Sequence, residues 1–458
     1  MAEREFDAIV LGAGAPGEVC AGRIAEGGLR VAIVEPGLIG GECSYYACMP
    51  SKALLRPGEL YAEARRVPGV KQAVTGVLDA AAMLARRDEV IHDLDDSVQL
   101  PWLEERDIEV FRGAGRLDGE RRVVVGDETL TATRAVVVAT GSSAAMPPIE
   151  GLDEVRTWNN RDATTSKTVP ESLVVLGAGP VGTELALAWS TLGAAVTLVG
   201  ADERVLPREE PFTGELVAES LRDAYGVDVR TETRANRVAA TGSGVEVFFE
   251  DGSSAEAAEV LVAVGRTPRT ESIGLDSVGA EIDEHGFLVA DDRLRVGGRD
   301  WLYAVGDVNG RALFTHMGKY QGWVAAENIH GRPVEAITEG IGSPRVIFTD
   351  PQVAAVGRTL AEAEAAGIDV RAVDVGTEGT AGASFQGKGT GGTTRLVVDE
   401  SRELIVGATF CGFETADFLH AATVAIVGEV PLKRLRHAVA AYPTRSELWL
   451  KLLEAYGL

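Results

Sequence analysis

The chain has 458 residues, which at roughly 150 residues per domain predicts about three domains. Hydrophobic residues make up 45% of the chain and charged residues 25%, values that are ordinary for a globular protein and exclude a mainly disordered chain. The 69 acidic residues outnumber the 44 basic ones, for a net charge of −25. This balance argues against nucleic acid and anionic membrane surfaces as partners, because both are bound through cationic contacts.

Neither the N-terminal residues nor the interior of the chain predicts export or membrane insertion. The N-terminus carries Glu3, Arg4, Glu5 and Asp7, unlike a signal peptide. The longest uncharged stretch, residues 185–201, falls short of a spanning length and contains Ser, Thr and Gly. Because four cysteines are also too few for a secreted disulfide scaffold, we expect a cytoplasmic protein.

The first thirty-five residues have the pattern strand, glycine turn, helix, strand. An apolar run that ends at Leu11 leads into a G-x-G-x-x-G formed by Gly12, Gly14 and Gly17, and a second apolar run ends in Glu35. Such glycines allow a tight turn, and the following helix N-terminus binds a pyrophosphate. The carboxylate of Glu35, 18 residues after Gly17, can accept hydrogen bonds from ribose hydroxyls. The pattern predicts a dinucleotide site.

The same plan recurs near residue 175. The apolar run Leu173–Leu176 precedes Gly177, Gly179 and Gly182, and a helical stretch then leads to an apolar strand, Ala195–Val199. A single G-x-G-x-x-G is a weak signal, but two copies that each lie between a strand and a helix support one another. Two dinucleotide sites in one chain suggest FAD together with NAD(P).

From about Gly340 the pattern changes to that of an α+β module. Thr393–Val398 and Leu404–Phe410 are predicted strands, and Thr415–Val427 is a predicted helix. The segment Gly382–Lys388 fits G-x-x-x-x-G-K, but Gly389 follows where a phosphate loop needs Ser or Thr, and a strand-like run comes next. We interpret it as a glycine-rich turn.

Two cysteines with four residues between them, Cys43 and Cys48, directly follow the first nucleotide pattern. A zinc site would need four ligands, and Cys20 and Cys411 each stand alone, so no metal site is expected. Two buried thiols are the simpler alternative. A disulfide would have to distort a helix, because residues five apart rise about 7.5 Å whereas bridged Cα atoms lie within about 6.8 Å. Strained disulfides are the labile, catalytic kind.

With these residues the chain resembles the class I pyridine nucleotide-disulfide oxidoreductases, a flavoprotein family that includes dihydrolipoamide dehydrogenase, glutathione reductase and mercuric reductase. The resemblance covers essentially the whole chain. The motifs that carry it are the cysteine pair with Pro50-Ser51-Lys52, Thr140-Gly141, Gly265-Arg266-Thr267-Pro268, Gly306-Asp307, and Phe348-Thr349-Asp350-Pro351.

The resemblance implies an α/β fold of two Rossmann-like dinucleotide-binding domains and a C-terminal α+β dimerisation domain. Residues 1–147 and 268–338 would bind FAD, residues 148–267 would bind NAD(P), and residues 339–458 would form the interface of a homodimer. The expected cofactor-binding residues are Gly12, Gly14, Gly17, Glu35, Gly41, Lys52, Thr140, Gly141, Gly177, Gly179, Gly182, Glu184, Gly265, Arg266, Gly306 and Asp307.

The resemblance also implies roles for the cysteines. Electrons would pass from NAD(P)H through FAD to a Cys43–Cys48 disulfide. Cys48 would face the flavin as a charge-transfer thiolate, and Cys43 would attack the substrate. Lys52 and Glu184 match residues beside the flavin and nicotinamide, although an ordinary ion pair between helices would also explain them.

The chain departs from the family near its C-terminus. Disulfide-reducing members carry His-Pro-Thr-x-x-Glu, whose histidine serves the partner subunit as an acid–base, and here Tyr442 replaces it while Glu447 is kept. A phenol titrates near 10 and is a poor base at neutral pH. His437 could take over, or Tyr442 could simply line the site. Mercuric reductases resemble the chain in having tyrosine there, but their C-terminal cysteine pair is absent.

The second nucleotide pattern is also unusual. Family members that prefer NAD end the second strand with an acid, and here that position is Gly200, with Asp202, Glu203, Arg204 and Arg208 nearby. The loss of the acid and the added arginines favour NADPH over NADH.

The sequence therefore predicts an FAD-dependent NAD(P)H oxidoreductase with a redox-active Cys43–Cys48 pair. Its small-molecule acceptor would be an electrophile that needs no strong histidine base: a metal ion, a quinone or an unusual disulfide. One alternative is a dihydrolipoamide dehydrogenase-like reductase of small disulfides. Another is a non-catalytic flavoprotein that senses NAD(P)H.

Overall fold

The fold comes from a computed structural model, which describes residues 2–458. By packing, the chain divides into two compact units. The first contains the segment up to Pro50 together with Asp88–Ala145 and Gly265–Glu339, and the second contains Ser51–Arg87, Met146–Val264 and Gly340–Leu458. Within residues 2–458, no helix combines the length and apolar character needed to cross a membrane.

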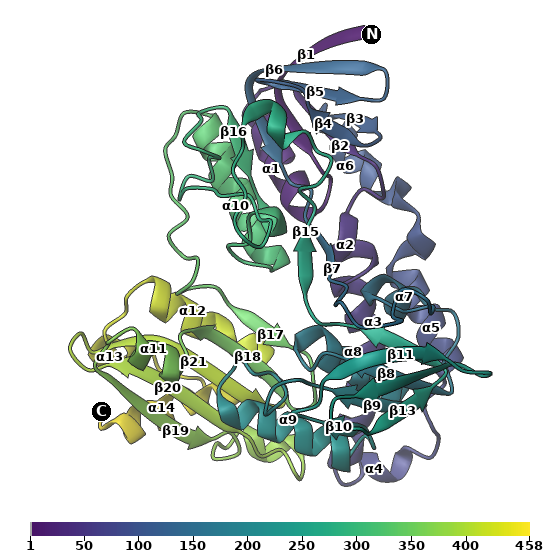
Figure 1. Cartoon of the computed structure of the whole chain (residues 1–458). Helices are drawn as coiled ribbons and strands as arrows, with labels where there is room; N and C mark the ends of the chain where they lie inside the picture. The colour runs from purple at the N-terminus through teal and green to yellow at the C-terminus, as the bar shows by residue number, and fades with distance from the viewer. Residues whose placement is uncertain (1) are drawn as a thin grey trace. The chain divides into compact units, whose positions relative to one another are not determined.

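The first unit is built on a seven-stranded sheet whose central strand is β1 (Ala2–Leu11). This strand pairs in parallel with β2 (Val31–Glu35) on one side and β6 (Glu128–Val138) on the other. Helix α1 (Ala15–Glu26) connects β1 to β2 (Figure 1). The predicted strand–turn–helix–strand is therefore confirmed, and the turn lies at the carboxyl end of β1, where parallel sheets bind nucleotides.

The outer strands of this sheet come from two distant parts of the chain. They are β3 (Glu109–Arg112), β4 (Gly115–Leu117), β5 (Arg122–Val125) and β16 (Leu302–Ala304). A short ribbon of β7 (Ser142–Ala144) and β15 (Arg266–Pro268) completes the unit's strands.

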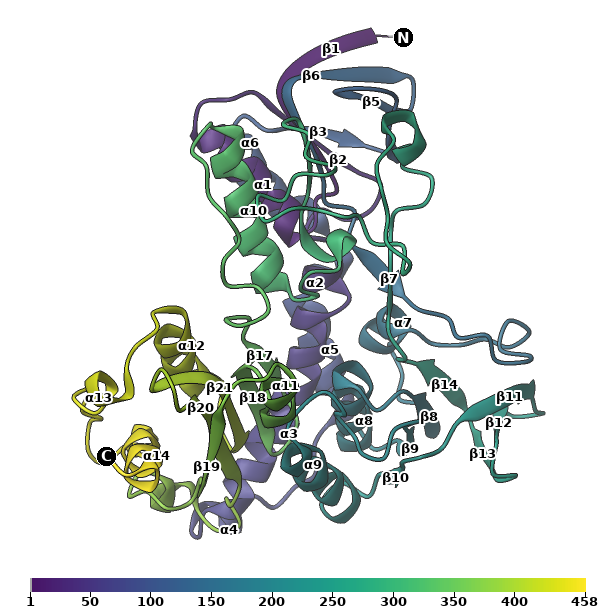
Figure 2. The ribbon, with the colours of Figure 1, turned by 60° about the vertical axis from the view of Figure 1, so that its left-hand side comes forward.

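Helix α10 (Thr315–Ile329) packs beside α1 on one face of the sheet (Figure 2). The approach is close because Gly322 has no side chain: a Cβ there would lie 2.7 Å from the Pro16 carbonyl oxygen and 3.1 Å from the Cys20 nitrogen. Cys20 is fully buried in the apolar core between the helices and the sheet. This thiol is thus a packing group.

The second unit contains a four-stranded parallel sheet with the second nucleotide pattern at its centre. Strand β8 (Ser172–Leu176), helix α8 (Pro180–Thr191) and strand β9 (Ala195–Val199) follow one another as predicted. The further elements are β10 (Asp228–Arg230), β14 (Glu259–Val262) and α9 (Pro211–Asp223), with an antiparallel sheet of β11 (Ala235–Ala240), β12 (Val245–Phe249) and β13 (Ser254–Ala257).

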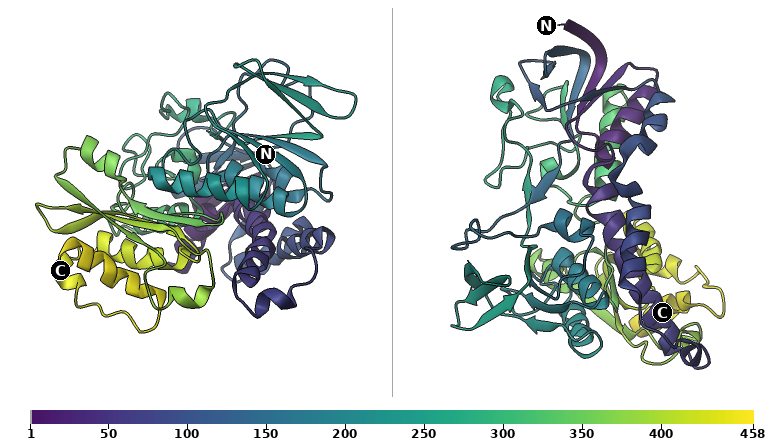
Figure 3. Two further views of the ribbon diagram at one scale, coloured as in Figure 1. Left: turned by 90° about the horizontal axis from the view of Figure 1, so that it is seen from below. Right: turned by 90° about the vertical axis from the view of Figure 1, so that its right-hand side faces the viewer.

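The C-terminal part of this unit is a five-stranded antiparallel sheet. Its strand order is β17 (Arg345–Ile347), β18 (Gln352–Gly357), β21 (Leu404–Gly412), β20 (Thr393–Asp399) and β19 (Val370–Gly376). Helices α12 (Leu419–Val427) and α14 (Leu448–Tyr456), yellow in Figure 3, pack on one face of the sheet. The predicted α+β module is present.

The remaining elements are helices and short 3₁₀ turns. The helices are α2 (Gly41–Tyr45), α3 (Cys48–Arg66), α4 (Val70–Ala73), α5 (Ala80–Val90), α6 (Leu100–Glu104), α7 (Asn160–Thr165), α11 (Leu360–Ala365) and α13 (Leu432–Leu435). The turns are η1 (His92–Leu94), η2 (Asp96–Gln99), η3 (Leu275–Val278), η4 (Gly306–Asn309), η5 (Ala383–Gln386), η6 (Ala416–Phe418) and η7 (Arg445–Glu447).

Two sequence expectations concern this C-terminal region. The helix expected over residues 415–427 begins as the 3₁₀ turn η6 and becomes α-helical only at Leu419. The decoy phosphate loop is a turn around η5, with positive φ at Gly387 and Gly389, and leads into β20 instead of a helix. Its rejection as a phosphate site is supported.

A buried ion pair holds α9 to the C-terminal sheet within the second unit. Glu210, whose side chain is 2% exposed, accepts a hydrogen bond from Arg395 at 2.8 Å and one from the backbone N–H of Leu360 at 2.8 Å. Arg395 also binds Asp374 at 2.7 Å. Removing one member of such a pair leaves an uncompensated buried charge.

We therefore expect Arg395→Met to lower the free energy of unfolding by about 3–5 kcal/mol, seen as a lower urea midpoint. Arg293→Met is the control, because it breaks an exposed ion pair with Glu335 at 3.4 Å and should cost less than about 1 kcal/mol. Equal midpoints for the two variants would contradict the structural role of Glu210.

Candidate functional site

The first nucleotide turn leaves room for a ligand at one glycine and none at two others. A Cβ on Gly12 would lie 2.3 Å from the Ala139 carbonyl oxygen, and one on Gly17 would lie 2.0 Å from the Gly12 carbonyl oxygen. A Cβ on Gly14 would meet nothing closer than 3.9 Å. Gly14 is the N-cap of α1 and supplies no side-chain cap, so the first N–H groups of the helix face this open space. The turn fits the pyrophosphate of FAD.

Glu35 lies at the end of β2, as expected of a ribose-binding acid. Its Oε2 accepts the Ala13 N–H at 2.7 Å, and its Oε1 accepts the Gly37 N–H at 2.8 Å. Each carboxylate oxygen can accept a second hydrogen bond, so ribose hydroxyls can still bind. The backbone bonds fix the orientation of the carboxylate beside the turn.

Gly306 and Asp307 follow β16 and are held by two sets of polar contacts. Ser142 donates its hydroxyl to Asp307 Oδ2 at 2.5 Å, and the Gly306 N–H donates to Gln321 Oε1 at 2.6 Å. Gln321 is fully buried on α10 and also accepts a hydrogen bond from Asn309 at 2.9 Å. The side chain of Gln321 thus ties the Gly306–Asp307 turn to α10.

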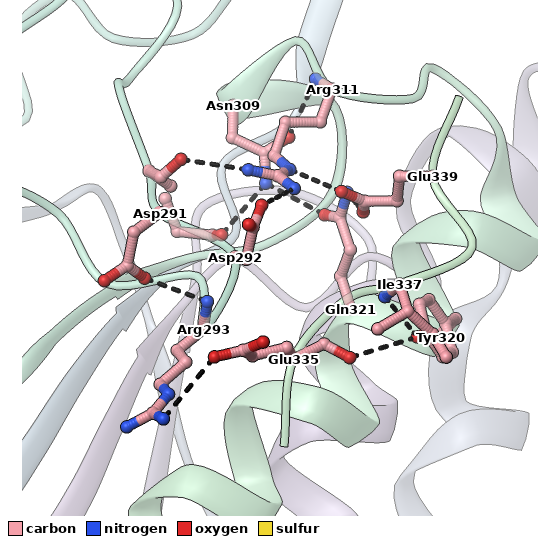
Figure 4. A network of polar contacts seen from close by, with 12 residues as sticks. Asp291, Asp292, Arg293, Asn309, Arg311, Tyr320, Gln321, Glu335, Ile337 and Glu339 are labelled. Carbon is pink, nitrogen blue, oxygen red and sulfur yellow. Dashed lines mark hydrogen bonds and ion pairs between the residues drawn. The ribbon is translucent and has the colours of Figure 1, made fainter. Parts of the chain in front are cut away.

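Figure 4 shows how this network continues through the first unit. The Gln321 amide donates to Glu339 Oε1 at 2.6 Å, and Glu339 also binds Arg311. Arg311 in turn reaches Asp292 at 2.8 Å. Glu339 and Arg311 are mostly buried and oppositely charged. Their attraction offsets the desolvation free energy that either charge would lose if it were buried alone.

The two cysteines lie on either side of a helix break. Cys43 is in α2 and Cys48 is the first residue of α3, while Tyr46 between them has a non-helical backbone with φ −133° and ψ −4°. The break is the kind of distortion that a disulfide between the two cysteines would require. Both cysteines are thiols in the structure and are in hydrogen-bond contact with each other. The Cys48 thiol and burial together raise the pKa of Cys43, as expected for a neutral dithiol.

Cys48 sits where two helices begin. Its Sγ lies 3.4 Å from Oγ1 of Thr315, the first residue of α10, and Cys48 itself opens α3. The positive ends of helix dipoles stabilise a thiolate. The backbone also links the thiols to the nucleotide turn, because a Cβ on Gly41 (φ +60°) would lie 2.9 Å from the Gly14 Cα.

The sequence did not predict a series of polar side-chain contacts that starts at Glu42, next to Cys43. Glu42 accepts a hydrogen bond from Arg269 at 3.0 Å and lies 3.9 Å from Arg266. Arg266 donates at 2.9 Å to the hydroxyl of Ser142, which binds Asp307. The Gly-Arg-Thr-Pro motif thus contacts Asp307 through Ser142, and its cofactor-binding role stays a prediction. Neither spacing nor residue type in the sequence indicates Glu42 as its contact.

Other predicted residues of the first unit, Thr140, Gly141 and Gly265, lie near this series of contacts. The Thr140 hydroxyl donates to the Arg269 carbonyl at 2.7 Å, and the Gly141 carbonyl accepts the Arg269 N–H at 2.9 Å. The Gly265 carbonyl accepts the Ala145 N–H at 3.0 Å. These bonds join β7 and β15 near Asp307.

The second nucleotide turn repeats the geometry of the first. A Cβ on Gly182 would lie 1.8 Å from the Gly177 carbonyl oxygen, whereas one on Gly179 would meet nothing within 4 Å. Gly179 caps α8 without a side chain, so this turn also fits a dinucleotide phosphate. After β9, the buried Gly200 provides no side chain for the ribose, and Arg208 is exposed.

The second unit also contains the predicted Lys52–Glu184 contact. The Lys52 ammonium lies 2.6 Å from Glu184 Oε2, and Glu184 Oε1 accepts the Phe348 N–H at 2.8 Å. The ammonium also lies 4.9 Å from the centre of the Phe348 ring. The ion pair exists; its role beside a flavin and a nicotinamide stays a prediction.

The residues of the C-terminal motif, Tyr442 to Glu447, lie in the second unit. Tyr442 is 78% exposed, and Glu447 accepts the Gly382 N–H at 3.4 Å. His437 is exposed in the turn after α13. Tyr442, Glu447, Lys52, Glu184 and the second glycine turn belong to the second unit, whereas both cysteines and the other predicted residues belong to the first.

Comparison with known proteins finds two family models that together match most of the chain. The family model for pyridine nucleotide-disulphide oxidoreductases matches residues 6–329, and the model for the dimerisation domain of that family matches residues 343–452. The mercuric reductase of Staphylococcus aureus is 30% identical over 447 residues, which span 97% of this chain and 81% of the relative. The dihydrolipoyl dehydrogenase of Bacillus subtilis is 30% identical over 457 residues, 98% of this chain and 96% of the relative.

Solved structures share the fold. LpdA from Mycobacterium tuberculosis has a TM-score of 0.87 at 24% identity, covering 99% of this chain and all of its own. The HOCl-induced flavoprotein disulfide reductase RclA from Escherichia coli has a TM-score of 0.86 at 24% identity, covering 98% of this chain and 99% of its own.

The two glycines of the first turn give a matched pair of variants. Gly17→Ala should prevent the turn from closing, because the methyl group has no space beside the Gly12 carbonyl, and we expect little folded protein. Gly14→Ala should fold, because φ is −71° there, but its methyl would occupy the pyrophosphate position and weaken FAD binding by about tenfold or more. FAD titration of the apoproteins measures this. Unchanged affinity in Gly14→Ala would place the pyrophosphate elsewhere.

Proposed function

Because the chain belongs to the pyridine nucleotide-disulphide oxidoreductase family, we propose that it carries electrons from NAD(P)H through FAD and a Cys43–Cys48 redox pair to an electrophilic small molecule. The protein is an FAD-dependent NAD(P)H oxidoreductase. The observation that carries the proposal for the cysteines is the 3.4 Å contact of Cys48 with Thr315, together with the close approach of Gly41, two residues before Cys43, to Gly14 of the nucleotide turn.

Bound FAD would supply two-electron chemistry between the nicotinamide and the sulfur pair. The residues of the first unit suit its site: Gly14 and the start of α1 would bind the pyrophosphate, Glu35 would bind the ribose, and Asp307 would hold the ribityl chain. In the second unit, Gly179 and the start of α8 would bind NAD(P)H, and Glu184 would hold the Lys52 ammonium in position.

The sulfur chemistry follows from where the two thiols lie. Two electrons and one proton convert the Cys43–Cys48 disulfide to one thiol and one thiolate, and the helix starts at Cys48 and Thr315 favour the charge on Cys48. The Cys43 thiol loses its proton and its sulfur attacks a substrate disulfide, which forms a mixed disulfide and releases a substrate thiolate that takes up this proton. The Cys48 thiolate then attacks the Cys43 sulfur, re-forms the Cys43–Cys48 disulfide and releases the second substrate sulfur as a thiolate, which takes up a proton from water.

Tyr442 is the reason for proposing an acceptor that needs no histidine base. An exposed tyrosine in a dimerisation domain suits a role in a partner subunit's site, and Val439 and Phe385 are 89% and 67% exposed in the same region. We accordingly propose a homodimer whose acceptor is a metal ion, a quinone or an unusual disulfide. The relatives named mercuric reductase are consistent with a metal ion, and those named dihydrolipoyl dehydrogenase support the small-disulfide alternative.

Two narrower assignments accompany this proposal. Residues 1–147 and 268–338 form the FAD domain, residues 148–267 the NAD(P) domain and residues 339–458 the interface domain. NADPH is favoured as donor, because Gly200 leaves no acid to bind a free ribose hydroxyl, and the exposed Arg208 is available for a 2′-phosphate.

The role of Cys48 predicts a colour change. Anaerobic two-electron reduction of the FAD-loaded protein should produce a long-wavelength thiolate-to-flavin charge-transfer band, and Cys48→Ser should abolish it. The test is an absorbance titration. Simple bleaching of the wild-type flavin, with no such band, would show that Cys48 does not face it.

The nature of the acceptor is tested at Tyr442. The native enzyme should reduce lipoamide slowly, since a well-placed histidine contributes about 10²–10⁴ in rate. Tyr442→His should raise kcat/KM for lipoamide and leave that for a quinone nearly unchanged, and Tyr442→Phe is the matched control without an acid–base group.

Cys43→Ser separates the two electron paths in the same assay. It should abolish lipoamide reduction and preserve quinone reduction, because a quinone can draw electrons directly from the flavin. Fast lipoamide turnover by the native enzyme would refute the proposal and support the dihydrolipoamide dehydrogenase-like alternative. If the enzyme turns over none of lipoamide, quinones and Hg(II), the alternative of a non-catalytic flavoprotein that senses NAD(P)H would be favoured instead.

A further inference from the structure

Helix α10 brings a lysine to the thiol side of the first unit. Its first residue, Thr315, touches Cys48, and Lys319 follows one helical turn later. Residues four apart lie on the same helix face with Cβ atoms about 6 Å apart, so Lys319 extends from the face that carries Thr315. Its side chain is exposed, and it forms no ion pair within 4 Å with any carboxylate of residues 2–458.

The backbone at Lys319 is fixed by packing and not by the lysine itself. The neighbouring Gly318 is buried, and a Cβ there would lie 2.5 Å from Pro16 Cγ and 3.2 Å from the Gly306 Cα. Helix α10 is thus seated against the start of α1 and the Gly306–Asp307 turn. The backbone from which the Lys319 side chain extends is therefore fixed relative to the Gly306–Asp307 turn.

The electrostatic surroundings of Cys43 have opposing effects. Its hydrogen bond with Cys48, burial and the closeness of the second sulfur raise the pKa of Cys43, whereas Thr315 and the charge of Lys319 lower that pKa. On its own helix, the neighbouring Glu42 is held by Arg269 and Arg266. His316, next to Thr315, is exposed and stacks on Phe314 with ring centres 5.5 Å apart.

Glu18, in the first turn of α1, is an acid whose charge interacts with that of Lys319. Burial raises the pKa of Glu18 to about 7, while Lys319 lowers that pKa and Glu35 raises it. Burial thus disfavours the charged carboxylate, which weakens Glu18 as a counter-charge to Lys319.

We propose that Lys319 is the cation that stabilises the Cys43 thiolate, a charge that histidine supplies in disulfide-reducing relatives and that Tyr442 lacks. The inference rests on the proposed role of the Cys43–Cys48 pair. Lys319 acts through Cys43 and is a positioning residue. Lys319 supplies a positive charge but does not transfer a proton. This agrees with an acceptor whose reduction needs no strong base.

The test measures alkylation of Cys43 in the FAD-loaded enzyme after anaerobic two-electron reduction. The thiolate displaces iodide from iodoacetamide and forms a thioether, so the rate across a pH series reports the pKa of Cys43. Lys319→Gln should shift the profile upward by roughly half to one pH unit, which makes alkylation at pH 7 about three- to tenfold slower. Lys319→Arg should stay within about twofold of wild type, because it keeps the charge.

Two further measurements separate this effect from a structural one. Lys71→Gln, on the exposed face of α4, removes the same charge from the chain and should leave the profile unchanged. High salt should move the wild-type profile toward that of Lys319→Gln and barely move the variant, because exposed charges are screened. FAD content and quinone reduction should be the same in all proteins.

The outcomes are distinguishable. Identical profiles for wild type and Lys319→Gln would overturn the role of Lys319 while leaving the redox pair intact. If iodoacetamide already alkylates both Cys43 and Cys48 in the oxidised wild-type enzyme, no disulfide forms between them, and the proposed function itself fails. A shift in Lys319→Arg as large as in Lys319→Gln would assign the effect to the lysine's shape and would also reject the electrostatic proposal.

Discussion

The first unit depends on how closely its backbone packs around the start of α1. Gly12, Gly17 and Gly41 each lie where a side chain would collide with main-chain atoms, and Gly318 and Gly322 allow α10 the same approach. This packing brings the nucleotide turn, the cysteine turn and the start of α10 together. The geometry is dense and therefore rigid, because a packed interior has no space to absorb displacement.

Polar contacts then position the groups that the packing brings together. Glu42, Arg266 and Ser142 form a continuous path from the Cys43 turn to Asp307, and Arg269 also binds Glu42. Gln321 reaches the same turn from α10. Both paths consist of partly or fully buried groups, where a hydrogen bond to a charge is worth more than on the surface.

The electrostatics of the site contrast with those of the whole chain. The chain carries a net charge of −25, yet Cys48 lies at the start of two helices and Lys319 extends from the second of them. The distant charges of the chain have little effect at the thiols, because interactions between exposed charges fade over about 10 Å in salt. The net charge of the chain therefore concerns which partners it can bind, while the helix starts and charges near Cys43 and Cys48 concern the reactivity of the thiols.

The sequence by itself determined the two nucleotide units, the C-terminal α+β module and most of the residues expected to bind cofactors. These follow from local rules: glycine spacing reports a tight turn, apolar runs report buried strands, and a Cys-x₄-Cys with Pro-Ser-Lys resembles one family. The Lys52–Glu184 contact was also anticipated, although only as one of two interpretations.

Only the tertiary structure decided which residues surround those motifs. Glu42 and Arg269 are 227 positions apart, and Thr315 lies 267 positions from Cys48, so no local pattern relates them. The helix break between Cys43 and Cys48 was predicted as a distortion, but its contact with the start of α10 was not. Side chains that approach through long-range packing leave no periodicity in the sequence, and Thr315 lies beside Cys48 only because the fold brings the starts of α3 and α10 together.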